Sequence, residues 1–162
     1  MYDIRKIGKN GIDTKGEFDI CLPPDFGAGE ETNVKFSGRL TRALDSFVLD
    51  GEGECILETS CCRCLKTHET TAHFKVLENF VEQELVNEGL AADYDDIIFD
   101  DETINIFPAI EKNLLNNIPM KFTCSEDCAG LCPFCGINLN HSECNCADQP
   151  RSEFAELLPK LK

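Results

Sequence analysis

Short stretches of alternating apolar and polar residues run through the first half of the chain, and this pattern is typical of β-strands with one buried face. Residues 18–22 alternate before the break at Pro23 and Pro24, and residues 34–40 alternate again. Residues 47–49, 55–59 and 67–80 are rich in β-branched and aromatic side chains. The sequence Asp50-Gly51-Glu52-Gly53 is a turn signal between the first two of these segments. The pattern predicts a mostly antiparallel N-terminal sheet or a partly open barrel.

The periodicity changes in the second half of the chain. Residues 103–106 have the pattern of a short strand, and Pro108 then stands at the start of an expected helix, where its missing N–H costs nothing. Apolar residues recur on one face of this helix, which ends at Pro119: Phe107, Ile110, Leu114, Leu115 and Ile118. A short terminal helix is expected to carry an apolar stripe of Phe154, Leu157, Leu158 and Leu161. We expect that stripe to pack on the sheet, with partner binding as the alternative, in a fold of the α+β class.

Charge is distributed unevenly along the chain, whose formal net charge is −15. Residues 82–102 contain nine acids and no base, and small residues interrupt this stretch. The acids are Glu82, Glu84, Glu88, Asp93, Asp95, Asp96, Asp100, Asp101 and Glu102. This composition predicts a solvated acidic loop, and its first eight acids are candidates for binding a basic partner. The spacing of a calcium-binding helix–loop–helix motif is missing, which argues against a divalent-cation site built of carboxylates.

The expected organisation is one domain with three segments. Residues 1–81 form a β-rich core with a C-x2-C turn, residues 82–102 form the acidic loop, and residues 103–162 form a helix and a cysteine-rich zinc module packed on the core. Residues 1–10 are charged and lack the apolar centre of a signal peptide. No apolar run approaches the ~20 residues of a membrane span, so we expect a cytoplasmic protein.

Eleven cysteines carry the candidate chemistry, and six of them lie between Cys124 and Cys146. Two C-x2-C turns, Cys61 to Cys64 and Cys132 to Cys135, each aim a pair of thiolates at one ion. We expect Cys132, Cys135, Cys144 and Cys146 to form one zinc site. We expect Cys61, Cys64, Cys124 and Cys128 to form a second site, which links the β-rich half to the C-terminal module. Four thiolates close the coordination of zinc, so one or two structural zinc ions are predicted.

Several other assignments of the cysteines remain open. An odd cysteine count without a signal peptide argues against a disulfide framework, whereas an iron–sulfur cluster also suits four thiolates. Cys124 and Cys128 can alternatively pair with Cys132 and Cys135, or His141 can replace a cysteine. Cys62 is the odd thiol of its turn. Two further cysteines, Cys21 and Cys55, lie in apolar strand patterns and are expected to be buried.

These motifs resemble a known family. Residues 124–140 are similar to the YceD signature C-x3-C-x-G-L-C-x2-C-G-x-N-L-N, and C-x-C follows as Cys144-Asn145-Cys146. The turn Cys61-Cys62-Arg63-Cys64-Leu65 resembles the family's C-x-R-C-L, and residues 148–151 resemble its D-P-R tail with Gln149 inserted. The resemblance implies a role in accumulation or maturation of large-subunit ribosomal RNA, in bacteria and plant organelles.

The composition limits how such a role is performed. Acidic proteins are repelled by the phosphates of free nucleic acid, and the sequence has no nucleophile–base set, phosphate-binding glycine loop or basic stripe. We therefore expect a non-enzymatic factor in ribosome assembly that contacts a basic ribosomal protein or assembly factor on precursors of the large subunit. One alternative is a zinc module that binds RNA directly through Arg63, Lys66, Lys121 and Arg151. The other is a thiol redox switch that releases zinc on oxidation.

Overall fold

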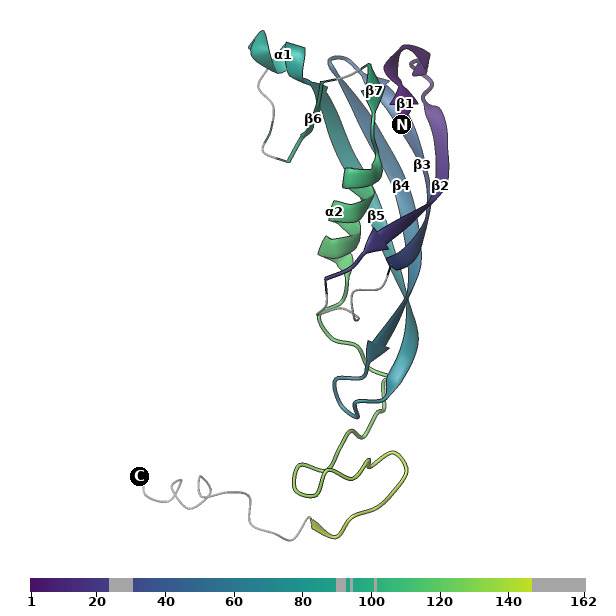
Figure 1. The fold of residues 1–162 in the computed structure, drawn as a ribbon, viewed down its shortest axis with the longest axis vertical. Helices are drawn as coiled ribbons and strands as arrows, with labels where there is room; N and C mark the ends of the chain where they lie inside the picture. Colours follow the sequence, from purple (N-terminus) through teal and green to yellow (C-terminus); the bar gives the residue numbers. More distant parts are fainter. Residues whose placement is uncertain (24–30, 90–92, 94, 101, 147–162) are drawn as a thin grey trace, which may run out of the picture. The chain divides into compact units, whose positions relative to one another are not determined.

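The computed structural model of the chain describes residues 1–23, 31–89, 93, 95–100 and 102–146 (Figure 1). The expected terminal helix with Phe154, Leu157, Leu158 and Leu161 lies outside the described residues. The chain divides into two compact units. Unit 1 comprises Met1–Thr59 and Glu69–Met120, and unit 2 comprises Ser60–His68 and Lys121–Lys162.

A five-stranded sheet is the main feature of the fold. Its strands, in spatial order, are β2 (Ile12–Cys21), β3 (Glu31–Ala43), β4 (Ser46–Ser60), β5 (Thr67–Glu82) and β6 (Ile97–Phe99). β2, β3 and β4 pair antiparallel, whereas β6 pairs parallel with β5. β2 and β6 are the two edges, so the sheet is open. The α+β class and the mostly antiparallel sheet predicted from the sequence are confirmed.

The remaining elements of unit 1 are short. β1 (Tyr2–Asp3) pairs antiparallel with β7 (Thr103–Ile104), and a 3-10 turn, Ile4–Lys6, follows β1. The helix α2 (Phe107–Asn117) begins where the sequence predicts, because Asn105 Oδ1 accepts a hydrogen bond from the Phe107 amide and Pro108 occupies the first turn. Figure 1 shows α2 running alongside the sheet.

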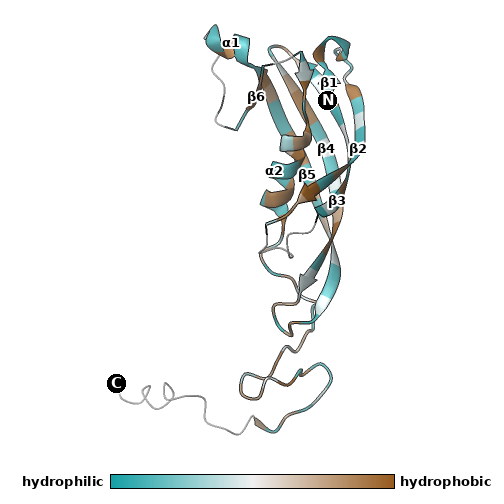
Figure 2. Ribbon diagram, in the orientation of Figure 1, coloured by the Kyte–Doolittle hydropathy of each residue, from teal (hydrophilic) through white to brown (hydrophobic). Residues whose placement is uncertain are grey.

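The core of unit 1 lies between one face of the sheet and α2. Apolar residues alternate with polar ones along the strands, as Figure 2 shows, and the apolar set is buried. The core residues include Ile20, Val34, Phe36, Leu40, Leu49, Leu57, Val76, Phe80, Ile104, Ile110 and Leu114. The rings of Phe18 and Phe107 lie 6.3 Å apart and join β2 to α2. The predicted apolar face of α2 is therefore the face that covers the sheet.

One buried charge also holds α2 in place. Glu78 of β5 is buried, and its two carboxylate oxygens accept hydrogen bonds from Lys112 Nζ at 3.1 Å and Asn113 Nδ2 at 2.6 Å. A buried carboxylate requires such partners, because an unpaired charge in the core costs several kcal/mol. The pair of bonds therefore fixes the position of α2 along β5.

The turn expected at Asp50-Gly51-Glu52-Gly53 is not a turn, because β4 continues through it. Aromatic rings on the neighbouring strands occupy the space that side chains at these glycines would need. A Cβ at Gly51 would lie 2.6 Å from Phe36 Cζ, and a Cβ at Gly53 would overlap the ring of Phe74. Gly38 of β3 lies directly opposite Gly51, so the two backbones can approach closely. The glycines make room for core aromatics within the sheet.

Secondary structure also occurs within the stretch expected to be an acidic loop. A one-turn helix, α1 (Gln83–Asn87), directly follows β5, and β6 adds three residues to the edge of the sheet. Asp96 supports this return of the chain, since its carboxylate accepts hydrogen bonds from Asn79 Nδ2 and from the Asp93 amide. These parts of residues 82–102 therefore belong to unit 1.

Candidate metal centres

Four cysteines from two distant segments of unit 2 come together in a first tetrad, which we define as Cys61, Cys64, Cys124 and Cys128. Their sulfurs all lie within 4.8 Å of one another, with Cys61 and Cys128 3.8 Å apart and Cys64 and Cys124 3.6 Å apart. Tetrahedral zinc–thiolate bonds of ~2.3 Å place the sulfurs ~3.8 Å apart. The first tetrad therefore has the dimensions of a mononuclear four-thiolate site.

A local turn at the start of the first tetrad positions two of these sulfurs. The Leu65 amide donates to the Cys61 carbonyl at 2.9 Å, and the Arg63 amide points at Cys61 Sγ at 3.4 Å. The backbone of Leu65 has a φ of 59°, a conformation that non-glycine residues seldom adopt. We call this turn, residues 61–65, the first knuckle.

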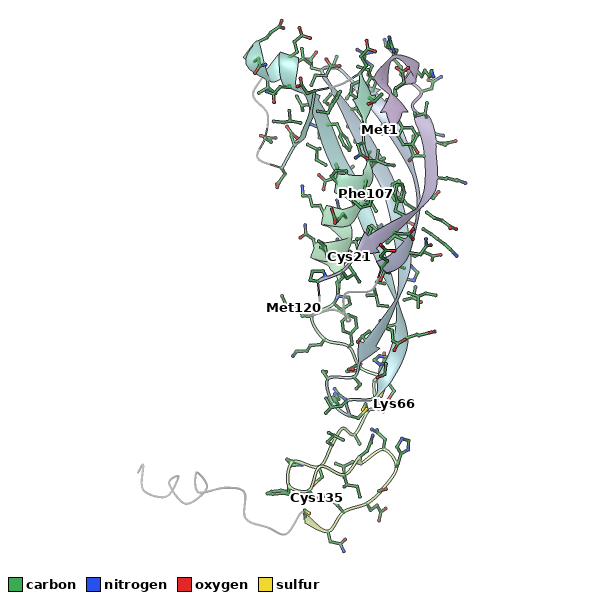
Figure 3. The ribbon with its side chains drawn as sticks, viewed as in Figure 1. Met1, Cys21, Lys66, Phe107, Met120 and Cys135 are labelled. Carbon is green, nitrogen blue, oxygen red and sulfur yellow. The ribbon has the colours of Figure 1, made fainter. Side chains whose placement is uncertain are left out.

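A second turn of the same form, residues 132–136, is the second knuckle. The Gly136 amide donates to the Cys132 carbonyl at 2.9 Å, and the Phe134 amide points at Cys132 Sγ at 3.5 Å. Gly136 has a φ of 73°, which glycine adopts without a steric penalty. The second tetrad comprises Cys132, Cys135, Cys144 and Cys146, whose sulfurs also lie within 4.8 Å of one another. Figure 3 labels Cys135 of this tetrad and Lys66, the residue after the first knuckle.

The electrostatics of both tetrads favour negative sulfur at some positions and oppose it at others. Backbone amides, above all the amide of Cys124, lower the pKa of Cys61 to about 5. The amides of Cys135 and Phe134 lower the pKa of Cys132 to about 6. The neighbouring thiols raise the pKa of Cys124 and of Cys146 to about 12. Four thiolates so close together require a cation, and each tetrad could hold a metal ion.

Arg63 is a structural residue of the first tetrad that the sequence analysis did not recognise. Its Nη1 donates to the carbonyls of Glu126 at 3.1 Å and Cys128 at 3.0 Å, and its own carbonyl accepts from the Leu131 amide at 3.0 Å. The arginine thus fastens the first knuckle to the segment that carries the other two ligands. The C-x-R-C spacing was the available signal for this role.

Asn140 is a second residue of this kind, and it lies in the spacer between the ligands of the second tetrad. Its Nδ2 donates to Cys128 Sγ at 3.3 Å, and its Oδ1 accepts from the Ala129 amide at 2.8 Å. The side chain of Asn138 supports it by accepting from the Asn140 amide at 3.0 Å and from Nδ2 at 2.8 Å. These contacts give both asparagines of the N-L-N motif a structural role.

Comparison with known proteins gives a match to a family. The family model described as "Large ribosomal RNA subunit accumulation protein YceD" matches residues 49–162, which include both tetrads, Arg63 and Asn140. The chain belongs to the YceD family. Neither a curated protein nor a solved structure matches this YceD chain. The resemblance found in the cysteine motifs is thereby confirmed.

The two tetrads of this YceD-family protein differ from the alternative ligand groupings considered from the sequence. Cys124 and Cys128 converge with the upstream pair rather than with Cys132 and Cys135, and the four-residue groups do not include His141. Cys62 is exposed. The expectation that Cys21 is buried was wrong, because the alternation at the end of β2 buries Ile20 and Leu22 and leaves Cys21 exposed. Cys55 is buried as expected, and burial raises its pKa to about 11.

The acidic residues proposed to bind a partner differ in the contacts that they make within the protein. Asp96 is hydrogen-bonded within unit 1, and Asp101 lies outside the described residues. Glu102, which completes the run, pairs with Arg5 at 2.8 Å. The side chains of Glu82, Glu84, Glu88, Asp93, Asp95 and Asp100 form no hydrogen bond or ion pair with other described residues. None of the helices in the described part of the YceD chain is long and apolar enough to cross a bilayer.

Proposed function

We propose that this protein is a non-catalytic factor that supports accumulation and maturation of large-subunit ribosomal RNA during ribosome assembly. The observation that carries the proposal is the family match over residues 49–162, which spans the whole set of tetrad cysteines. The family is described by the accumulation of an RNA rather than by a reaction. Two groups of four sulfurs support a structural use of metal, because four thiolates leave no open position for water.

Zinc is the metal we propose for both tetrads. Sulfur separations of 3.6 and 3.8 Å in the first tetrad match a single tetrahedral ion. In a four-iron cluster each thiolate binds a different iron, so the sulfurs lie farther apart than this. When bound, zinc would hold the knuckles in place as a structural ion. Arg63, Phe134 and Asn140 would donate hydrogen bonds to the ligating sulfurs and offset their excess negative charge.

The two units differ in formal charge, and this difference suggests which of them contacts a basic partner. Unit 1 contains 24 acidic and 9 basic residues, and unit 2 contains six of each, so the entire formal charge of −15 belongs to unit 1. A strongly negative surface attracts basic proteins and repels phosphate. We therefore propose that unit 1 contacts a basic ribosomal protein or a basic assembly factor.

A recess in unit 1 is suited to a basic side chain from such a partner. Acidic residues line it, and Ile4 and Phe99 supply its apolar part, in a volume of about 220 Å³. The acids at the recess are Glu82, Glu84, Asp100 and Glu102. The apolar residues would contact the aliphatic stem of a lysine or arginine, and the carboxylates of Glu82, Glu84 and Asp100 would pair with its charged end, since Glu102 already pairs with Arg5.

Sedimentation of tagged protein from cell lysate tests the assembly role. We expect co-migration with precursors of the large subunit, and we expect ribosomal proteins to remain attached after RNase treatment. Loss of all partners on RNase treatment would instead support direct RNA binding through Lys66 and Lys121, which are exposed in unit 2. Protein that stays at the top of both gradients would contradict action on assembling particles.

A charge-matched pair of variants tests the acidic surface. Glu82→Gln with Glu84→Gln and Asp100→Asn removes three charges at the recess, and we expect weaker association with basic partners and a smaller salt dependence. Glu17→Gln with Glu58→Gln and Glu69→Gln removes three charges from exposed strand positions of unit 1. Equal weakening by both sets would show that net charge, rather than the recess, governs binding.

A further inference from the structure

We infer that Asn140 is a positioning residue that couples metal binding at the two tetrads, so that an ion in the second tetrad strengthens binding in the first. This inference rests on the metal binding proposed above. Asn140 belongs to the spacer between Cys135 and Cys144, two ligands of the second tetrad, yet its side chain contacts Cys128 of the first.

The contact is built from more than one hydrogen bond. Nδ2 of Asn140 donates to Cys128 Sγ at 3.3 Å, while Oδ1 accepts from the amide of the next residue, Ala129, at 2.8 Å. An amide N–H directed at a ligating sulfur offsets part of the negative charge that the sulfur carries as a metal-bound thiolate. The same side chain therefore both orients Cys128 and stabilises its negative charge.

The backbone around Asn140 ties this contact to the second knuckle. The Leu139 amide donates to the Gly130 carbonyl at 2.9 Å, and the Cys132 amide donates to the Ile137 carbonyl at 2.8 Å. Leu131 and Asn138 form an antiparallel bridge between these bonds. An ion held by Cys132, Cys135, Cys144 and Cys146 closes the spacer on both sides, and Asn140 is then held against Cys128 without further ordering.

The coupling works in both directions. If an ion in the second tetrad raises the affinity of the first by some factor, an ion in the first must raise the affinity of the second by the same factor. Removal of a residue next to metal ligands commonly costs about 10–100-fold in affinity. We expect a coupling factor of this size, with the second tetrad, whose ligands are close in sequence, filling first.

Titration of the metal-free full-length protein with Co²⁺ against a competing chelator tests the inference, because tetrahedral cobalt–thiolate sites absorb visible light. The double variant Cys144→Ser with Cys146→Ser leaves only the first tetrad intact, and we expect its Co²⁺ affinity to be about 10–100-fold below that of the first tetrad in the unchanged protein. Asn140→Ala should weaken the first tetrad by a similar factor and shift its sulfur-to-cobalt absorption band, while two ions still bind at saturation. The three substitutions together should weaken it no more than either change alone.

Asn145→Ala is the matched control, because Asn145 lies between Cys144 and Cys146, is exposed, and forms no side-chain hydrogen bond with the described residues. It should leave both affinities and both spectra unchanged. Full additivity, or an unchanged first tetrad in Asn140→Ala, would overturn the inference. If the double serine variant does not fold, the Co²⁺ affinity of the first tetrad in Asn140→Ala, which keeps the second tetrad intact, decides whether the inference holds. Failure of the unchanged protein to bind Co²⁺ would overturn the metal proposal as well, whereas binding of two ions without coupling would overturn the inference alone.

Discussion

Leu65 and Gly136 occupy the same place in the two knuckles, and both have a positive φ, 59° and 73°. Each follows the second cysteine of its turn, and each donates its amide to the carbonyl of the first cysteine at 2.9 Å. Glycine accepts this backbone without strain, whereas leucine pays a conformational cost. The geometry of the knuckle is thus set by the cysteines and their hydrogen bonds rather than by the residue at this position.

The effect of a substitution at Leu65 on stability should depend on how well the new residue tolerates a positive φ, and not on its hydrophobicity. The side chain is 66% exposed, so little packing is lost when it is changed. We expect Leu65→Val to destabilise metal-loaded protein by roughly 1–2 kcal/mol, because β-branched residues oppose this conformation. Leu65→Asn should be neutral or slightly stabilising, since asparagine tolerates it. Chelator-induced unfolding at equilibrium measures both; a valine variant as stable as the asparagine variant would argue against a strained turn.

Two glycines of unit 2 provide a second comparison. A Cβ at Gly136 would meet nothing within 4 Å, whereas a Cβ at Gly130 would lie 3.1 Å from the carbonyl oxygen of Arg63. Both have positive φ, so alanine at either should cost roughly 1 kcal/mol in backbone strain. Gly130→Ala should cost more, because it displaces the carbonyl that accepts from Leu131. Thermal unfolding of the metal-loaded variants gives the ranking, and equal losses would show that the Arg63 carbonyl moves away freely.

Alkylation of native, metal-loaded protein should separate the cysteines into three groups. Cys21 and Cys62 are exposed and should react with iodoacetamide at pH 8. Cys55 should resist because it is buried and its pKa is raised to about 11, so the reactive thiolate is scarce well below that pH. The eight tetrad cysteines should react only after chelation of the metal. Peptide mass spectrometry reads each site, and labelling of Cys132 or Cys135 before chelation would contradict metal ligation there.

Gly53 should not accept a side chain. Alanine at this position would overlap the ring of Phe74, so we expect Gly53→Ala to destabilise unit 1 by about 1–3 kcal/mol. Gly8→Ala is the control, because a Cβ there meets nothing within 4 Å. In a Phe74→Leu background the cost of Gly53→Ala should fall, since the two residues contact each other. Urea unfolding measures each step of this cycle, and a cost independent of residue 74 would point to a backbone effect instead.

The alternation of apolar and polar residues was enough to predict the strands, because side chains on a strand point to opposite faces in turn. It was not enough at Gly51 and Gly53. There, glycines that resemble a turn in the sequence are required by rings from other strands, and no local pattern contains that information. β6 is only three residues long and pairs with β5, so its formation also depends on contacts distant in sequence.

The cysteine groupings could be anticipated because pairs of ligands lie close together in the sequence. The contributions of Arg63 and Asn140 could not be derived from spacing alone. Arg63 contacts carbonyls more than sixty residues away, and Asn140 contacts a sulfur of the tetrad to which its own loop does not belong. Residues that orient ligands act through such contacts, so their roles become visible only with the fold.

The ligands of the first tetrad also set an order of events during synthesis. Cys61 and Cys64 leave the ribosome about sixty residues before Cys124 and Cys128, and β5, α1, β6, β7 and α2 of unit 1 are made in between. Until residue 124 has emerged, only the two sulfurs of the first knuckle are available to an ion from this tetrad. The first tetrad can therefore be completed only after the last residue of unit 1 has been translated, so an ion that binds there would meet a chain whose sheet strands have all been made.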